Sequence, residues 1–370
     1  MFEYVTKAFP IDNFTSHIKQ FWPHPSSDIF LPHPIFLQQK ELDEWSISAC
    51  EIANLLSVPK VHSIGLTELN ESLLSKIPEC FSVDFAIIEN DNKLSVRLIE
   101  AQGFPSVMSA MLDLECLFQP NAKLGSRGIE TRRQIMTQAI TNNLVPEHVI
   151  MLDDNVSYQT TGMDFMSSMV FSSPRCITSL YQYQEKWMHW RDAGAYDVKR
   201  IYHRSIFHTL NKEKQQKMLA LLGQQKITHY NHPAWYYKID KTSLGKIVHW
   251  SIPNTHSIDD AKYFDLQNMV LKYPNGFAGN EIFISPSNAQ VNQAPVGSIL
   301  QDLINYSAFY PSSSGDKKLC VELRFMLINT SSGYIPVTTL AKATYDGNLM
   351  RYRKNKQLGE GFTVAIGLDE

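Results

Sequence analysis

Two acids and an amide stand near the ends of two strand-like segments, where they could hold a cation. The segments are Val83–Ile88 and Leu94–Glu100, and the residues between them are typical of a turn. In such a hairpin the open ends face each other, so the carboxylates of Asp84 and Glu100 can converge, and Gln102 adds an amide oxygen on the face of Glu100. Oxygens of this kind suit Mg²⁺. The alternative, which the spacing leaves open, is a solvated hairpin with acids at its ends.

Two lysines on strand-like segments are candidates for holding phosphate. Lys241 lies in an Ile-Asp-Lys-Thr run, and Lys272 lies in a Val-Leu-Lys-Tyr run just before a loop that contains Gly276 and Gly279. A lysine is a compact cation, and a glycine-bearing loop lets backbone N–H groups approach a phosphate closely. The loop is not the phosphate-binding motif GxxxxGK[ST], and a plain hairpin turn is the alternative. Because Leu266–Asn280 contains no acid, a buried Lys272 needs an anion from elsewhere.

A third candidate region follows, with an apolar run and then a strand that alternates in character. The run Ile299–Ile304 carries Gln301, Asp302 and Leu303, and the later strand places Glu322 and Arg324 on one face. The planar fork of Arg324 could bind a γ-phosphate or a substrate carboxylate. A surface salt-bridge face is the alternative.

The elements that must position these residues fall into four segments. We expect an N-terminal arm with a helix over 1–76, the hairpin followed by two helices over 77–146, alternating strands and helices over 147–232, and a strand-rich segment over 233–370. The helices are expected at Gln38–Leu56, Pro105–Phe118, Gly128–Leu144, Thr161–Val170 and Leu180–Arg191, and a buried parallel strand at His148–Asp154. The fold class is therefore α+β.

The composition excludes several classes of protein and of partner. The chain has 370 residues, 44% of them hydrophobic and 19% charged, with a formal net charge of -3. These values exclude a disordered chain, a coiled coil and a collagen, and charge gives no reason to expect nucleic acid or membrane as a partner. Nothing approaches the roughly 18 apolar residues of a membrane span. The five cysteines are scattered, and no signal peptide is evident, so we expect a cytoplasmic protein with reduced thiols.

The histidines and nucleophiles give no independent site. His203 and His208, and His229 and His232, lack an acid or cysteine at zinc-ligand spacing. We expect most of the twelve histidines to lie at the surface or in the interior with satisfied nitrogens. No G-x-S-x-G elbow or CxxC pair indicates a covalent nucleophile.

In their order along the chain, these motifs resemble the ATP-grasp superfamily in a circularly permuted arrangement, as in the glutathionylspermidine synthase-like ligases. Lys241, Lys272 with its glycine loop, the 299–304 run and Glu322-x-Arg324 keep the family order, whereas the metal hairpin stands first. Two departures concern Gln102, where the family has Asn, and Lys342, where related proteins often carry arginine.

The resemblance implies two β-rich lobes that clamp ATP and a small α/β layer domain like the pre-ATP-grasp domain. It implies that Lys241, Lys272, Gly276 and Gly279 contact phosphates, and that Gln301, Asp302 and Leu303 border the adenine. Mg²⁺ would lie at Asp84, Glu100 and Gln102, with Arg204 and Arg324 as catalytic residues. The implied activity is ATP- and Mg²⁺-dependent joining of a small-molecule or peptide carboxylate to an amine through an acyl phosphate. Two alternatives stay open: a nucleotide-binding protein without turnover, and a non-enzymatic scaffold whose motifs coincide by chance.

Overall fold

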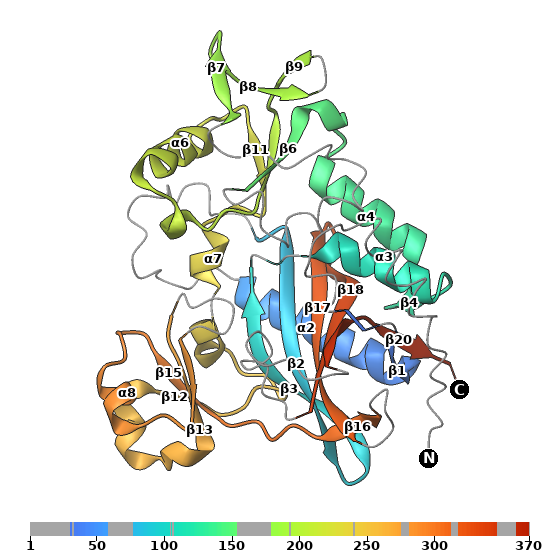
Figure 1. Ribbon diagram of the computed structural model, residues 1–370, viewed down its shortest axis with the longest axis vertical. Coiled ribbons are helices and arrows are strands. Elements are labelled where there is room, and N and C mark those ends of the chain that lie inside the picture. Colours follow the sequence, from blue (N-terminus) through green and yellow to red (C-terminus); the bar gives the residue numbers. More distant parts are fainter. Residues whose placement is uncertain are drawn as a thin grey trace.

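A six-stranded antiparallel sheet forms the centre of the protein (Figure 1). The computed structural model describes residues 30–31, 33–57, 77–103, 105, 107–153, 179–191, 194–239, 241–274, 281–311, 317–345 and 360–369. The sheet order is β19-β18-β17-β2-β3, and β16 also pairs with β17. The bounds are β2 Cys80–Asn90, β3 Lys93–Gln102, β16 Ala308–Pro311, β17 Lys318–Thr330, β18 Gly333–Thr344 and β19 Gly361–Thr363. The predicted hairpin is confirmed, and the C-terminal strands β17 and β18 extend its sheet.

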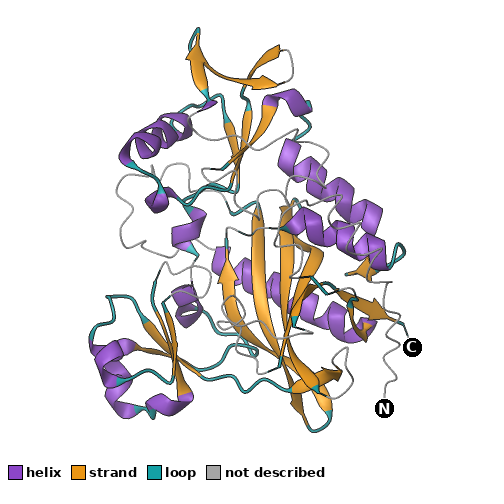
Figure 2. Ribbon diagram, viewed as in Figure 1, coloured by secondary structure: helices purple, strands orange, loops and turns teal. Residues whose placement is uncertain are grey.

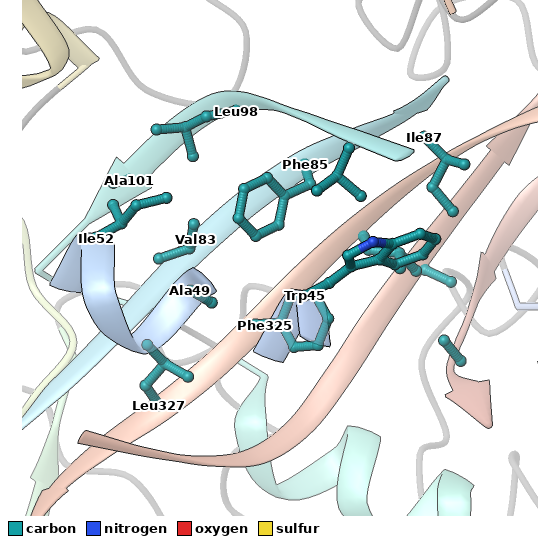
Figure 3. Close-up of a cluster of buried hydrophobic side chains, with 14 of the residues drawn as sticks. Trp45, Ala49, Ile52, Val83, Phe85, Ile87, Leu98, Ala101, Phe325 and Leu327 are labelled. Carbon is teal, nitrogen blue, oxygen red and sulfur yellow. The ribbon is translucent and has the colours of Figure 1, made fainter. Parts of the chain in front are cut away.

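Helix α2 (Gln39–Ser57) covers one face of this sheet. Its buried residues recur at helical spacing, as the sequence predicts, and Trp45, Ala49 and Ile52 meet Val83 and Phe85 of β2 (Figure 3). Alternation along β17 places Val321, Leu323, Phe325 and Leu327 in the same core. These strand residues point toward α2, so the residues between them must point to the opposite face.

The opposite face divides into an apolar half and a polar half. Helices α3 (Met108–Phe118) and α4 (Ile129–Thr141) pack over the apolar half, where Met326 and Ile328 of β17 lie with Met111 in a second core. The polar half carries Glu322 and Arg324, which precede Met326 on β17, and Asp84, which lies opposite Arg324 on β2. Both helices confirm sequence predictions.

A second, four-stranded antiparallel sheet lies apart from the first (Figure 2). Its order is β12-β15-β13-β14, with bounds β12 Thr255–Ser257, β13 Met269–Lys272, β14 Ile282–Ile284 and β15 Ile299–Asp302. The short helix α8 (Asn288–Asn292) flanks this sheet. Its small core contains Met269, Leu271 and Leu300. Lys272 thus ends a strand, as predicted.

A small parallel sheet, β11-β10-β6, forms the third layer, with α6 (Lys212–Leu222) packed against it. Its bounds are β6 Val149–Leu152, β10 Arg200–His203 and β11 Thr228–Tyr230. The buried parallel strand expected at 148–154 is confirmed. The helix expected over Thr161–Val170 lies outside the described residues.

The helix expected over Leu180–Arg191 is wrong. The segment instead forms strands β7 (Tyr181–Tyr183) and β8 (Lys186–Arg191), which make a three-stranded ribbon with β9 (Gly194–Asp197). Gln184 and Glu185 both have positive φ, which is the geometry of a two-residue hairpin turn. Trp187 and His189 are buried and Trp190 is exposed, which is the period of two of a strand.

The remaining elements are short. Strand β1 (Ile35–Gln38) pairs with β20 (Ala365–Leu368), and β4 (Lys123–Leu124) pairs with β5 (Arg127–Gly128). Helix α7 (Trp235–Lys238) precedes a 3₁₀ helix at Lys241–Lys246, and further 3₁₀ turns lie at Pro146–His148, Phe207–Thr209, Ile258–Tyr263 and Leu266–Asn268. Among the helices described, none has the length and apolar character that crossing a membrane requires.

Candidate functional site

The predicted hairpin acids do lie opposite each other. Asp84 of β2 and Glu100 of β3 are direct cross-strand partners, and Gln102 donates from Nε2 to Glu100 Oε1 at 2.7 Å. In the next strand Arg324 is the partner of Asp84, and Lys342 of β18 is the partner of Glu322. Neighbouring strands therefore bring three acids and two cations to one face of the sheet.

A β-bulge in β3 sets the direction of Glu100. Phe85 pairs with Leu98, but Asp84 pairs with Glu100, so Ile99 is an extra residue without a cross-strand partner. Residues two apart normally share a face, yet Leu98 lies in the core and Glu100 lies beside Asp84. The bulge thus turns Glu100 toward the polar face and leaves the Ile99 carbonyl outside the regular ladder.

Two cations neutralise the buried acids, and we call the five residues Asp84, Glu100, Glu322, Arg324 and Lys342 the ion network. Arg324 donates from Nε and Nη2 to the two carboxylate oxygens of Asp84, each at 2.6 Å, and Nη2 also lies 3.2 Å from Glu100 Oε1. Lys342 Nζ lies 3.2 Å from Asp84 Oδ2 and also pairs with Glu322 Oε1. The Asp84 side chain is only 1% exposed. This is a dense, bidentate arrangement rather than a surface pair.

The ionisation of the network follows from burial and from these pairs. Burial raises the pKa of Asp84, but Arg324 and Lys342 outweigh it and hold the pKa at about 2. Burial lowers the pKa of Lys342, but the carboxylates of Glu322 and Asp84 raise it above its usual value. Asp84 therefore remains charged at neutral pH.

Lys272 joins the second sheet to the first. Its ammonium donates to the Ile99 carbonyl and to Gln301 Oε1, both at 2.6 Å, and Gln301 is held in turn by Nε2 donating to Thr255. Among the residues that the structure describes, no carboxylate forms an ion pair with Lys272, which is 4% exposed. Burial is the main cause that lowers its pKa to about 8; the nearby carboxylate of Glu100 opposes this effect, and the nearby charge of Lys241 adds to it. The two predicted lysines are thus close enough to repel each other.

The sequence predicted a strand at Lys241, and this prediction is wrong. Lys241 begins the 3₁₀ helix Lys241–Lys246. Ile239 and Leu244 both enter the main core. Residues five apart point to opposite faces of a strand, so the chain has to turn here. Lys241 is nevertheless buried, as a phosphate-binding lysine beside Lys272 would be.

The other predicted residues separate. In the 299–304 run, the Gln301 side chain points to Lys272, whereas Asp302 accepts from Asn254 and lies near His256, and the Leu303 amide donates to Asn268. Arg204, directly after β10, donates from Nη1 to the carbonyl of Pro105, three residues beyond Gln102. Gly276 and Gly279 lie outside the described residues.

The side-chain oxygens of Glu100 and Gln102 fit one magnesium ion, whereas those of Asp84 do not. Both oxygens of Asp84 accept from Arg324. Within the described part of the chain, Glu100 Oε2 and the Gln102 side-chain oxygen have no hydrogen-bond donor. No group of three or more His, Cys, Asp or Glu side chains in that part could hold a metal ion by itself. A carboxylate and an amide fit Mg²⁺ when phosphate oxygens and waters supply the other ligands.

Tyr306 is a site residue that sequence reasoning missed. Burial, followed by the nearby carboxylates of Glu322, Asp84 and Glu100, raises the pKa of its phenol well above the usual value. Tyr306 thus stays a neutral hydrogen-bonding group next to the ion network. It follows β15 in an irregular stretch, so no alternation marked it.

A second polar cluster, also missed, consists of His203, His229 and His232, which we call the histidine cluster. His203 Nε2 lies 2.9 Å from His229 Nδ1, and the ring of His232 is 6.2 Å from that of His203 and 5.7 Å from that of His229. His203 Nδ1, His229 Nε2 and His232 Nε2 are buried without a partner in the described structure. These three residues are therefore exceptions to the expectation that most of the histidines lie at the surface or have satisfied nitrogens.

Comparisons with known proteins add little to this geometry. No family model matches the chain, and no curated protein matches its sequence. Among solved structures, it is similar to the protein named "Putative gamma-glutamylcysteine synthetase" from Methylobacillus flagellatus KT, with a TM-score of 0.42 and 10% identity, over 79% of this chain and 80% of that one. A similarity at this level carries no argument about fold or function.

Proposed function

We propose that this protein is an ATP-dependent ligase that joins a carboxylate to an amine through an acyl phosphate. The observation that carries the proposal is the buried ammonium of Lys272, which has only neutral oxygens as acceptors and lies near a second buried lysine. Burying a cation with no carboxylate in direct contact is unfavourable, and an anionic ligand can supply that contact. A polyphosphate is such a ligand.

The nucleotide would lie between the two antiparallel sheets. Lys241 and Lys272 would contact its phosphates, because they are close together, and Asp302 and Leu303 at the end of β15 would border the adenine. Gln301 would act indirectly, since its side-chain oxygen accepts from Lys272 and orients the ammonium. The glycine loop with Gly276 and Gly279, which follows Lys272, completes the proposed phosphate contacts.

Glu100 and Gln102 would hold Mg²⁺, with Asp84 orienting Arg324 beside them. When bound, the ion would reduce the charge on the terminal phosphates of ATP. Arg324 Nη1 has no acceptor in the described part of the chain, so it can bind an incoming carboxylate while Nε and Nη2 stay fixed on Asp84. Arg204 is proposed to steer the same substrate group.

The proposed reaction is the one that the resemblance to the ATP-grasp ligases implies. A carboxylate oxygen of the substrate attacks the γ-phosphorus, the bond to the β-phosphate oxygen breaks, and ADP and an acyl phosphate form. The amine nitrogen then attacks the acyl carbon, phosphate leaves, and the nitrogen loses a proton. No covalent enzyme intermediate is needed, so the protein contributes positioning and charge neutralisation.

The test replaces Lys272 with methionine. Without its ammonium, ATP affinity should fall about tenfold or more, which corresponds to ~1.5–3 kcal/mol for a hydrogen bond to a charged group. The free energy of unfolding should stay the same or rise, because removal of the buried charge offsets the loss of two hydrogen bonds to neutral acceptors. Titration calorimetry with Mg·ATP and urea unfolding measure the two quantities.

Lys246→Met is the matched control, since Lys246 is exposed at the other end of the 3₁₀ helix that begins at Lys241. It should change neither quantity. A Lys272→Met protein that is destabilised but binds ATP normally would show that this lysine is structural. If Mg·ATP fails to raise the melting temperature of the parent protein, the nucleotide proposal itself is wrong.

One observation favours nucleotide binding without turnover as a second candidate. Arg324 and Lys342 already neutralise much of the acid charge, so less of it remains to organise a metal. Release of ADP in the presence of a panel of carboxylates and amines separates the two functions. Binding of ATP with no ADP release for any pair would favour the second.

A further inference from the structure

The histidine cluster lies at the carboxyl ends of the strands in the small parallel sheet. His203 is the last residue of β10, His229 lies in β11, and His232 follows two residues after β11 ends. Because β10 is parallel to both of its neighbours, the carboxyl ends of all three strands share one edge. Ligands of open parallel sheets bind at this edge.

Direct contacts join this edge to the open end of the hairpin. The side chain of Asn231 accepts from Cys80, at the start of β2, at 3.2 Å and donates to the carbonyl of His203 at 3.1 Å. Arg204, which follows His203, donates to the carbonyl of Pro105, three residues after β3 ends. The histidine cluster is therefore next to Arg204, which we propose to steer the substrate carboxylate.

Two of the three rings share a hydrogen bond, which limits the protons that they present to a ligand. Burial lowers the pKa of His203 and of His229, so both rings are neutral at pH 7 and each carries one N–H. His203 Nε2 and His229 Nδ1 lie 2.9 Å apart, and one of them donates to the other. In either tautomer, one of the two outer nitrogens, His203 Nδ1 or His229 Nε2, carries a proton and the other has a lone pair.

The third ring adds a donor. His232 Nδ1 accepts from the backbone N–H of Ala234 at 3.2 Å, so the neutral ring carries its proton on Nε2. The three outer nitrogens, His203 Nδ1, His229 Nε2 and His232 Nε2, are buried and have no partner within the part of the chain that the structure describes. The histidine cluster therefore presents two N–H donors and one lone pair, which are unfavourable in a protein interior unless a partner is bound.

This set of donors and acceptors distinguishes among classes of ligand. A carboxylate could accept from both N–H groups but has no proton for the lone pair, and an ammonium would bring its own protons against both N–H groups. Among the described residues, no group of His, Cys, Asp or Glu side chains could hold a metal ion. An amide matches all three nitrogens, since its oxygen can accept twice and its N–H can donate once.

We infer that the histidine cluster binds an amide group of a substrate, with its two N–H donors on the amide oxygen and its lone pair facing the amide N–H. This inference rests on the proposed function, because it gives the carboxylate substrate that Arg204 steers an amide group as well. The three histidines are then binding residues, and they select an amide over an ester, which lacks the N–H.

The test measures binding to the protein without ATP, so its failure would leave the nucleotide proposal unaffected. N-methylacetamide is the probe, and methyl acetate is its matched control, because an ester oxygen replaces the amide N–H. Each compound is titrated into protein with isotope-labelled histidine rings while NMR records the ring resonances. N-methylacetamide should shift the resonances of the three histidines saturably, and methyl acetate should bind about tenfold more weakly or worse.

Variants assign the resonances and test the donors. His232→Phe removes one N–H, so the affinity for N-methylacetamide should fall about tenfold, whereas His256→Gln, outside the cluster, should bind as the parent does. If His232→Phe does not fold, His229→Phe replaces it, because His229 is the one partly exposed residue of the cluster. The inference is overturned by the absence of a saturable shift, by equal affinity for methyl acetate, or by unchanged affinity in the folded phenylalanine variant.

Discussion

The ion network and the histidine cluster are both buried and polar, but they avoid the cost of buried charge in opposite ways. In the ion network, each acid contacts a cation that lies on another strand of the same sheet. In the histidine cluster, three rings pack together with no acid paired to them in the described structure. Charge is tolerated at Asp84 through pairing and avoided at the histidines through neutrality, whereas burial raises the pKa of Glu322 in the ion network to about 7.

The pKa values express the same contrast. The pKa of Asp84 falls to about 2 because the cations outweigh burial, so its charged form is favoured. Burial, and then the neighbouring His232 and Arg200, lower the pKa of His229 to about 3, and burial lowers that of His232 to about 4. Burial also lowers the pKa of His203, so the neutral forms are favoured there. The comparison teaches that one fold can bury titratable groups in either state when geometry supplies or denies a counter-charge.

The largest expected effect is a loss of stability in acid that comes from the histidine cluster. Below pH 6.5 the unfolded chain binds protons on these histidines, whereas the folded protein does not until pH falls to about 4 or 3. Since the unfolded state binds more protons, stability should fall between pH 7 and 5 by on the order of 4–6 kcal/mol. Urea unfolding at a series of pH values measures the slope.

His232→Gln removes one titrating ring, so the stability that this variant loses between pH 7 and 5 should be smaller by about a third. His256→Gln, at a partly exposed residue outside the cluster, is the control and should keep the parent slope. A parent protein whose stability is unchanged from pH 7 to 5 would contradict the idea that these rings are buried and neutral.

The next effect breaks the pairing in the ion network. Among the described residues, Arg324→Met leaves Asp84 with only Lys342 and leaves Glu100 without an ion-pair partner, so the free energy of unfolding should fall by about 3–5 kcal/mol. Adding Asp84→Asn should recover part of the loss, because fewer buried charges then lack partners. Urea unfolding of the two single variants and the double variant gives the coupling. Strictly additive losses would mean that the two residues do not interact as described.

The smallest effect concerns Glu100, which is the acid at the proposed metal side. Glu100→Gln keeps an acceptor for Arg324 but loses a charge, so stability should change little while Mg²⁺-dependent ATP affinity falls about tenfold, or ~1.4 kcal/mol. Calorimetry with and without Mg²⁺ measures it. Glu89→Gln, at the exposed far end of the hairpin, is the control. Equal Mg·ATP affinity in Glu100→Gln and the parent would place the metal elsewhere.

Short-range periodicity is enough to predict the elements whose side-chain directions depend on neighbouring residues alone. The two strands of the hairpin follow from alternation and a turn, although the direction of Glu100 depends on the bulge, and the shared face of Glu322 and Arg324 follows from the same period of two. The helical spacing of α2 is equally local. Where alternation was missed, at Trp187 and His189, the predicted helix was wrong.

Contacts between residues far apart in the chain depend instead on strand register and on bulges. The bulge at Ile99 releases a carbonyl for Lys272, which lies 173 residues later in the chain. The register of β17 against β2 and β18 brings Arg324 and Lys342 to Asp84, and the parallel pairing of β10 with β11 brings His203 to His229. Periodicity states the face that a side chain occupies, but register and bulges depend on how whole strands pack, and a shift by one residue would turn each of these groups away from its partner.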